Sequence, residues 1–204
     1  MLKKFFIFAS LALVMCSFTG TINYFEGTIT YEIKYESNDP VISTDMLAKQ
    51  YGDKMIVNFS IEKDNFSEDF NGTKLLLNSY SFLNNHLFVW GRSISSEIKN
   101  YIDCSKSNET LKSIEQKTST EKILDHTLSL VSITAEPSND GEEHFTMRDY
   151  YFSYDLFIQE GTFNICKYNS YDQIYSKTNT LPLKMVFENA AYKVTYTAIK
   201  IESN

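Results

Sequence analysis

The chain has 204 residues and a net charge of −7 at neutral pH, and its only two arginines are Arg92 and Arg148. Proteins bind nucleic acid through clustered lysine and arginine side chains, so this acidic composition argues against a nucleic-acid partner. It argues equally against a surface that docks on anionic lipid headgroups.

The N-terminal residues have the pattern of a secretory signal peptide. Lys3 and Lys4 precede an apolar stretch over residues 5–15. Such a stretch suits export, but it is shorter than the roughly 20 apolar residues that span a bilayer. We expect residues 1–20 to be the signal peptide and residues 21–204 to form a single exported domain.

Cys16 lies at the end of the apolar stretch and is a candidate lipidation site. Leu13-Val14-Met15-Cys16 resembles a bacterial lipoprotein cleavage box, although the residue before the cysteine is usually small and Met15 is not. Thr19 or Gly20 offers an alternative end for ordinary cleavage. The sequence therefore leaves two outcomes open, a lipid-anchored chain and an unmodified one.

Cys104 and Cys166 are the two cysteines that remain after removal of the signal. In an oxidising compartment they either pair as a disulfide or stay as two separate buried thiols. Pairing would close a loop of about 60 residues, which stabilises a fold by roughly 4 kcal/mol in the chain-entropy treatment. The sequence alone does not decide between these two states.

The most regular pattern of the chain lies in residues 25–36, where apolar and polar residues alternate over twelve positions. A period of two predicts a long strand with one buried face and one face in water. The side chains expected to face the core or a cavity are Ile29, Tyr31 and Ile33, and those expected to face solvent are Thr28, Thr30 and Glu32.

A short helix is expected next, over residues 43–52. Ser43, Thr44 or Asp45 can cap its N-terminus, and Gly52 ends it. Alternation resumes over residues 55–61, which predicts a second strand, and the polar residues 64–72 read as a turn region.

Residues 74–90 have the pattern of a β-hairpin, with two apolar arms separated by Asn84-Asn85. Residues 105–121 are rich in Lys, Ser, Thr and Glu and are expected to be a solvated helix or a loop. Further strands are expected at 128–134, 144–158, 181–187 and 192–201. An acidic loop at 136–143 is expected between the first two of them.

Many strands with at most two or three helices predict a mostly β fold of the α+β type. Strands of this length suit a curved antiparallel sheet that wraps over a few helices. Leu181-Pro182-Leu183-Lys184 opens the strand that is expected at 181–187. Pro182 is expected at the start of a strand or on an edge strand, and Leu183 is expected in the core.

The sequence contains no recognisable catalytic constellation. His86, His126 and His144 are scattered, and none has a second Cys or His at the spacing of a metal site. No Gly-x-Ser-x-Gly elbow and no glycine-rich phosphate loop occurs in the sequence. We therefore expect no catalytic residues, no metal site and no cofactor, and we do not expect an enzyme.

Several segments are similar to the lipoprotein-carrier superfamily, the LolA/LolB-like fold of exported Gram-negative proteins. They are residues 25–31, 154–158 and 171–175, followed by Leu181-Pro182-Leu183-Lys184 and the last strand at 195–201. The resemblance implies an incomplete antiparallel barrel wrapped over helices, with a hydrophobic cavity that binds acyl chains. It also implies residence in the periplasm or at the outer membrane.

One segment departs from that family pattern. Relatives often carry Gly-Tyr-x-Cys after Ile-Leu, whereas here Ile123-Leu124 is followed by Asp125-His126. The departure leaves the subfamily unassigned.

The favoured hypothesis is a monomeric, non-enzymatic envelope protein that holds a hydrophobic small molecule, lipid acyl chain or lipoprotein anchor. Its 15% aromatic content suits either a ligand-lined sheet or a filled core. The alternative is a structural or interaction module that has a filled core and docks an outer-membrane or other envelope protein. The candidate ligand-lining residues are Phe59, Phe82, Phe88, Trp90 and Phe152.

Overall fold

The computed structural model describes residues 23–60, 65–72, 76–83, 86–93, 96–138 and 145–204. Over residues 76–102 it describes the backbone only, so the side chains of Phe82, Phe88 and Trp90 lie outside the described part. Cys16 and the expected signal peptide also lie outside it.

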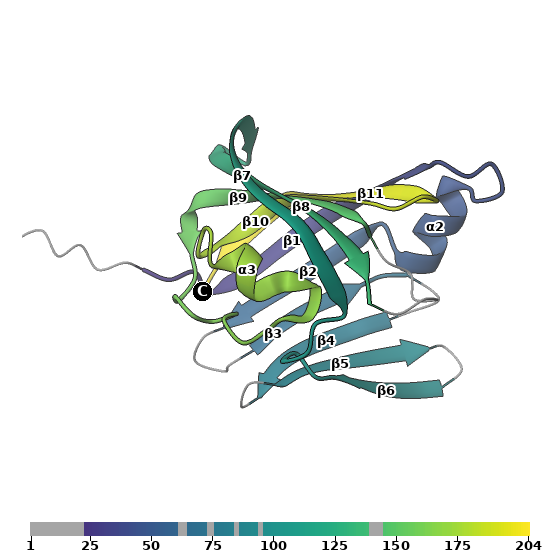
Figure 1. Ribbon diagram of the computed structural model, residues 1–204, viewed down its shortest axis with the longest axis horizontal. Coiled ribbons are helices and arrows are strands. Elements are labelled where there is room, and N and C mark those ends of the chain that lie inside the picture. Colours follow the sequence, from purple (N-terminus) through teal and green to yellow (C-terminus); the bar gives the residue numbers. More distant parts are fainter. Residues whose placement is uncertain (1–22, 61–64, 73–75, 84–85, 94–95, 139–144) are drawn as a thin grey trace, which may run out of the picture.

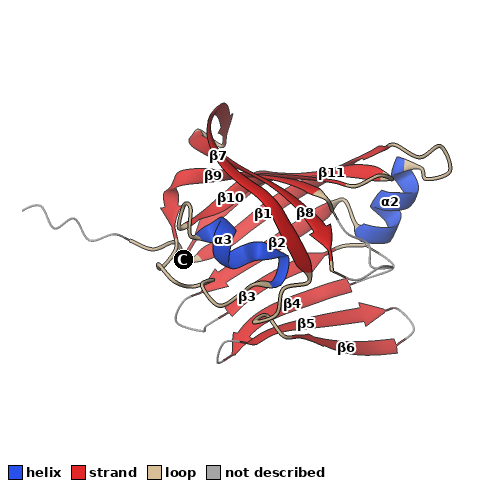
Figure 2. Cartoon of the chain, in the orientation of Figure 1, coloured by secondary structure: helices blue, strands red, loops and turns tan. Residues whose placement is uncertain are grey.

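Within these ranges, eleven strands form one antiparallel sheet (Figures 1 and 2). The first six strands are β1 Gly27–Ser37, β2 Lys54–Ser60, β3 Asn65–Phe70, β4 Leu76–Leu83, β5 His86–Ser93 and β6 Ser96–Ile102. The other five are β7 Glu109–Ile123, β8 His126–Pro137, β9 Met147–Phe157, β10 Thr180–Glu188 and β11 Tyr192–Ser203. The helical elements are α2 Thr44–Tyr51, η1 Tyr168–Ser170 and α3 Tyr171–Tyr175.

The strands follow one another as a meander in two arms. The order is β6-β5-β4-β3-β2-β1-β11-β10-β9-β8-β7, and the pairing of β1 with β11 joins the arms. The sheet is open, because its two edges are β6 and β7, the only consecutive strands of the described sheet that do not pair. Figure 1 shows the sheet bending so that η1 and α3 lie within the bend. The expected mostly β, curved antiparallel architecture is confirmed.

The alternation in the first strand sets its inward face as expected, but Thr28 is half-buried and Thr30 is buried on the face expected in solvent. Ile29, Tyr31 and Ile33 are all buried, and Glu32 is exposed. Thr30 was expected in solvent but is only 8% exposed. The register shift beside Thr30 leaves out Ile199 of β11 and no residue of β1, so Thr30 keeps the outward side of its strand and is covered there.

Helix α2 begins and ends at the expected residues. The Ser43 hydroxyl accepts a hydrogen bond from the Met46 backbone N–H at 3.1 Å, which makes Ser43 the N-cap. Gly52 ends the helix with φ of 96°, a conformation that glycine adopts without strain. The Tyr35 hydroxyl donates to the Gly52 carbonyl at 2.8 Å and ties this end of the helix to β1.

Two expectations for local structure were wrong. Residues 105–121 were expected as a helix or loop, but Glu109–Ile123 form the edge strand β7. Polar residues on both of its faces hide the period of two, because most of its side chains are exposed. Residues 64–72 were expected as a turn region, yet Asn65–Phe70 form β3, paired with β2 along its whole length.

Pro182 lies near the start of β10, which is an inner strand between β9 and β11. The pairing with β9 shifts register on both sides of it, between Thr180 and Pro182 and between Pro182 and Lys184. Proline has no N–H to donate to the ladder, so an irregularity at this point is expected. Leu183 is fully buried, as predicted.

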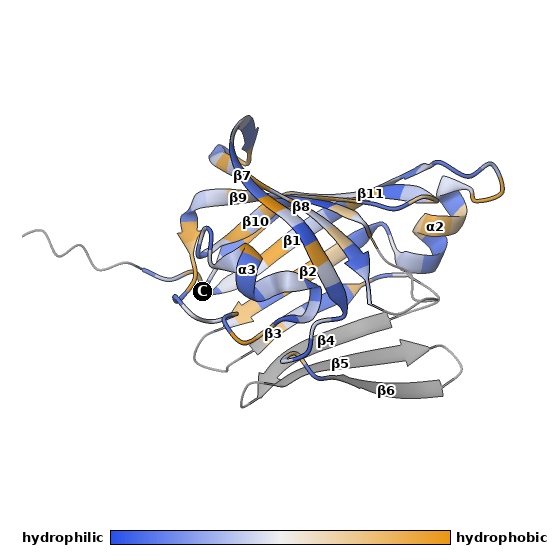
Figure 3. Ribbon diagram, viewed as in Figure 1, coloured by the Kyte–Doolittle hydropathy of each residue, from blue (hydrophilic) through white to orange (hydrophobic). Residues whose placement is uncertain are grey.

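The core fills the space between the concave face of the sheet and the segment 158–175, which we call the covering segment. Figure 3 shows apolar positions alternating with polar ones along β1 and β8. From the covering segment, the Phe163 ring lies 5.7 Å from the Phe66 ring and stacks at 3.9 Å on Tyr175. Tyr175 in turn contacts Phe152 of β9 at 5.6 Å. The covering segment thus connects the two arms of the sheet through aromatic packing.

Candidate functional site

The part of the concave face beneath α3 is packed core. Phe59 is 4% exposed and lies 6.5 Å from the ring of Phe66. Phe152 is fully buried between Tyr150, at 6.1 Å, and Tyr175. Of the five residues that the sequence suggested as ligand-lining, these two are the ones whose side chains are described. Both contact rings of the protein itself.

A second part of the concave face is lined by rings that remain half-buried. The Phe70 ring lies 6.5 Å from Tyr196, Tyr196 lies 5.5 Å from Phe187, and Phe187 lies 5.6 Å from Phe145. We call these four residues the aromatic wall. Phe70 and Tyr196 are three strands apart in the sheet, about 14 Å if it were flat. Their contact therefore shows that the sheet curls around an interior.

Glu68 places a carboxyl group beside the aromatic wall. It pairs with buried Val57 in the ladder, and on β3 it alternates with Phe66 and Phe70, so it shares their inward face. Its side chain is half-buried, and burial raises its pKa to about 7. No hydrogen bond or ion pair to Glu68 occurs among the residues that the structure describes. Glu68 was not identified as a site residue from the sequence, because residues 64–72 were assigned to a turn region. The alternation of Phe66, Glu68 and Phe70 was the pattern that indicated a strand.

Three buried tyrosines from separate elements lie within range of the Glu68 charge, which acts to raise the pKa of each. Burial and the charge of Glu68 raise the pKa of Tyr31 far above its usual range, and the Tyr31 hydroxyl donates to the Pro182 carbonyl at 2.6 Å. Burial raises the pKa of Tyr150 to about 12, against the lowering effect of Arg148. Burial likewise raises the pKa of Tyr175, with smaller effects from Tyr150 and Glu68. All three hydroxyls are therefore neutral at physiological pH.

A disulfide attaches the covering segment to the chain that follows β6. Cys104 and Cys166 are bonded, with their Cα atoms 4.6 Å apart and 62 positions apart in sequence. The Lys167 N–H donates to the Cys104 carbonyl at 2.7 Å beside the bond. Of the two states that the sequence left open, the structure has the paired one.

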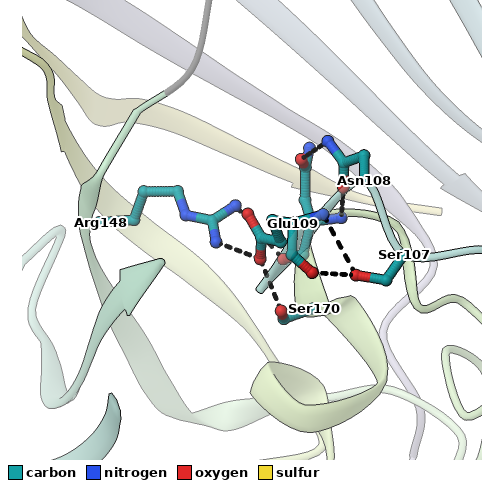
Figure 4. Close-up of polar contacts among 6 residues, drawn as sticks. Ser107, Asn108, Glu109, Arg148 and Ser170 are labelled. Atoms are coloured by element: carbon teal, nitrogen blue, oxygen red, sulfur yellow. Dashed lines mark hydrogen bonds and ion pairs between the residues drawn. The ribbon is translucent and has the colours of Figure 1, made fainter. Parts of the chain in front are cut away.

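A buried ion pair holds the same segment a few residues further along the chain (Figure 4). Arg148 of β9 donates through Nη2 to Glu109 Oε1 of β7 at 2.5 Å, and their side chains are 4% and 0% exposed. Ser170 donates its hydroxyl to the same Glu109 oxygen at 2.5 Å. Arg148 Nη1 also donates to the Asn169 carbonyl at 3.3 Å. One ion pair thus links two strands to the start of α3.

The backbone at this anchor is strained. Asn169 and Ser170 have φ of 52° and 56°, in the left-handed region that non-glycine residues seldom occupy. Asn108 stabilises the first of them, because its side chain accepts from the Asn169 N–H at 2.8 Å and donates to the Asn169 side-chain oxygen at 3.0 Å. Such strain persists only where the surrounding contacts determine the conformation.

A serine, a histidine and an aspartate meet on the β8–β9 pair, but not as a catalytic triad. Asp155 lies 2.6 Å from His126 Nδ1, and the Ser153 hydroxyl donates to Asp155 while lying 3.4 Å from the same Nδ1. A triad needs the serine on Nε2 and the aspartate on Nδ1. Burial acts to raise the pKa of Asp155, but the hydrogen bonds from Ser153 and His126 outweigh it and lower that pKa.

Among the described residues, no group of three or more His, Cys, Asp or Glu side chains is placed to hold a metal ion. Over the same ranges, no helix has both the length and the apolar composition needed to cross a bilayer. Comparison with protein-family models, curated proteins and solved structures gives no match.

Proposed function

We propose that this protein is a non-catalytic binding protein of the Gram-negative cell envelope that holds a hydrophobic ligand inside its curved sheet. The ligand is the acyl chain of a lipid or of a lipoprotein anchor. The observation that carries the proposal is the aromatic wall, whose four rings face the concave side and yet remain half-buried. Apolar side chains that face inward without being fully covered are the lining that an apolar ligand needs.

The architecture supports a LolA-like fold as part of this proposal. An open antiparallel sheet wraps over a helix-bearing segment, which is the arrangement that the resemblance to lipoprotein carriers implies. The resemblance also supplies the envelope location and the class of ligand. The disulfide is consistent with an oxidising compartment outside the cytoplasm.

The rival function is an interaction module with a filled core, and one observation favours it. Phe59 and Phe152 are packed against neighbouring rings, so the part of the interior that these two side chains line is filled by the protein itself. The proposal therefore places the ligand at the aromatic wall and not beneath α3.

The test is direct extraction followed by binding. The mature protein is purified from the envelope, extracted with organic solvent and examined by mass spectrometry for lipid, and then titrated with an uncharged fluorescent ester of a fatty acid. We expect co-purifying lipid and saturable binding. Absence of both at micromolar concentrations contradicts the proposal and leaves the interaction module.

Two substitutions on β11 locate the site. Tyr196→Glu places a charge on the aromatic wall, whereas Ile199→Glu places the same charge at a side chain that is 52% exposed. We expect Tyr196→Glu to weaken probe binding about tenfold or more, because a carboxylate beside an acyl chain must be desolvated. Ile199→Glu should leave binding unchanged, and equal effects would contradict a site at the wall.

A further inference from the structure

The interior holds a carboxyl group for which the described residues provide no counter-ion. Glu68 faces inward from β3, and the one described cation on that side, Arg148, is already engaged by Glu109 at 2.5 Å and by the Asn169 carbonyl at 3.3 Å. The other titratable groups coupled to Glu68 are the hydroxyls of Tyr31, Tyr150 and Tyr175. A carboxylate in an apolar setting is stable as an anion only when a cation is supplied.

Aromatic residues flank the same position along β3. Glu68 is flanked on its strand by Phe66 and Phe70, and the Phe70 ring touches Tyr196 at 6.5 Å. Tyr150, whose pKa the Glu68 charge acts to raise, lies 5.2 Å from Phe187 of the aromatic wall. The faces of aromatic rings attract cations, and they do so most strongly where water is excluded. A carboxylate among tyrosine and phenylalanine rings is therefore suited to a positively charged organic group.

We propose that the interior binds an amphipathic ligand with an ammonium head, which pairs with Glu68 while its apolar chain lies along the aromatic wall. This inference rests on the proposed function and specifies the head group of the ligand. A metal ion is a poorer occupant, because Glu68 is a single carboxylate with no second ligand of the metal-binding kind beside it among the described residues. An anionic head group would repel the Glu68 charge.

Three probes with the same dodecyl chain test the head group. They are dodecyltrimethylammonium, dodecanol and dodecyl sulfate, each titrated below its micelle concentration by displacement of a fluorescent apolar dye. We expect the ammonium probe to bind about tenfold more tightly than the alcohol, as for a desolvated ion pair. The sulfate is expected to bind most weakly.

Glu68→Gln removes the charge and keeps the shape. In this variant the ammonium and alcohol probes should bind equally, while alcohol binding stays as in the wild type. Asp69→Asn is the matched control, because Asp69 is the next residue of β3, faces the other side and lies 3.4 Å from Asn58. It should retain the tenfold preference.

A measurement on the unaltered protein keeps the test decisive if a variant fails to fold. The trimethylammonium group does not titrate, so any change with pH between about 5.5 and 8.5 comes from the protein. Burial raises the pKa of Glu68 to about 7, so the preference for ammonium over alcohol should grow as pH rises through that value. A preference that stays constant with pH contradicts the role of Glu68.

The outcomes separate this inference from the function on which it rests. Equal binding of all three probes overturns the ammonium head group and leaves the apolar binding function in place. Failure of every probe to bind overturns both. A preference for ammonium that survives Glu68→Gln shows that another group selects the head, and it too overturns the inference.

Discussion

A carboxyl group in an apolar setting keeps its proton to a higher pH than one in water, unless a cation accompanies it, and Glu68 is such a group. Burial raises its pKa from the ordinary 4.5 to about 7. The folded chain therefore holds this proton more tightly than the unfolded chain does, and the link between protonation and folding fixes the sign of a pH effect.

We expect the Glu68 carboxyl to favour the folded state below about pH 4.5 and to lose that contribution as pH rises to about 7. The loss is on the order of 3 kcal/mol. Other carboxyls act in the opposite sense, since hydrogen bonds lower the pKa of Asp103. The measurement is therefore a difference: urea unfolding of the wild type and of Glu68→Gln at several pH values. The variant should gain relative stability as pH rises, and a constant difference would contradict the prediction.

The buried ion pair gives a second prediction at the scale of single residues. Glu109→Ala leaves Arg148 buried without its carboxylate and is expected to cost about 3–5 kcal/mol of unfolding free energy. Glu32→Ala removes one member of the exposed pair with Lys34, whose side chains are 48% and 72% exposed, and should change stability little. Urea unfolding of both variants measures the contrast. Similar midpoints would mean that the Arg148–Glu109 pair does not stabilise the fold.

At the scale of elements, two adjacent residues of β10, Leu183 and Lys184, face opposite sides of the sheet. Leu183→Ala removes a fully buried side chain and is expected to cost about 2–5 kcal/mol. Lys184 faces the other side, where its ammonium lies 2.7 Å from Glu121 and 4.7 Å from the centre of the Tyr151 ring. Lys184→Ala should therefore cost only about 1 kcal/mol. Thermal or urea unfolding compares the two, and equal small effects would contradict the placement of Leu183 in the core.

The elements also show how far a sequence pattern predicts structure. β1 was predictable because one of its faces is buried and the other wet, which imposes a period of two. β7 was not, because an edge strand exposed on both faces leaves no such period. β3 was hidden for a different reason. Its inward positions include a carboxylate, and Glu68 breaks the apolar repeat where the candidate site lies.

The site was less predictable than the fold. Composition indicated that aromatic rings would line the sheet, but it did not distinguish rings of the core, such as Phe152, from half-buried rings, such as Tyr196. That distinction depends on where the covering segment lies. Its position is set by Arg148, Glu109 and Ser170, which are 22 to 61 positions apart and meet only in the folded chain.

At the scale of the whole molecule, the disulfide joins the chain after β6 to the covering segment. We expect a peptide map without reductant to contain a Cys104–Cys166 cross-linked pair. Replacement of both residues by serine should lower the free energy of unfolding by about 4 kcal/mol, the value for a closed loop of this length. Matched urea unfolding of the serine variant and the oxidised wild type measures it. Two free thiols at these positions in unreduced protein would contradict the pairing.

The unpaired edges of β6 and β7 have a mechanical consequence. A closed β-barrel has a circumference that is set by its number of strands and their stagger. The barrel therefore cannot widen unless the hydrogen bonds between two of its strands break. An open sheet does not have this constraint, because its two edge strands share no hydrogen bonds. Residues 103–108 connect the two edge strands β6 and β7, and they include Cys104 of the disulfide. Moving β6 away from β7 would therefore break no hydrogen bond between these two edges of the described sheet, while the disulfide keeps the covering segment attached to the chain between them.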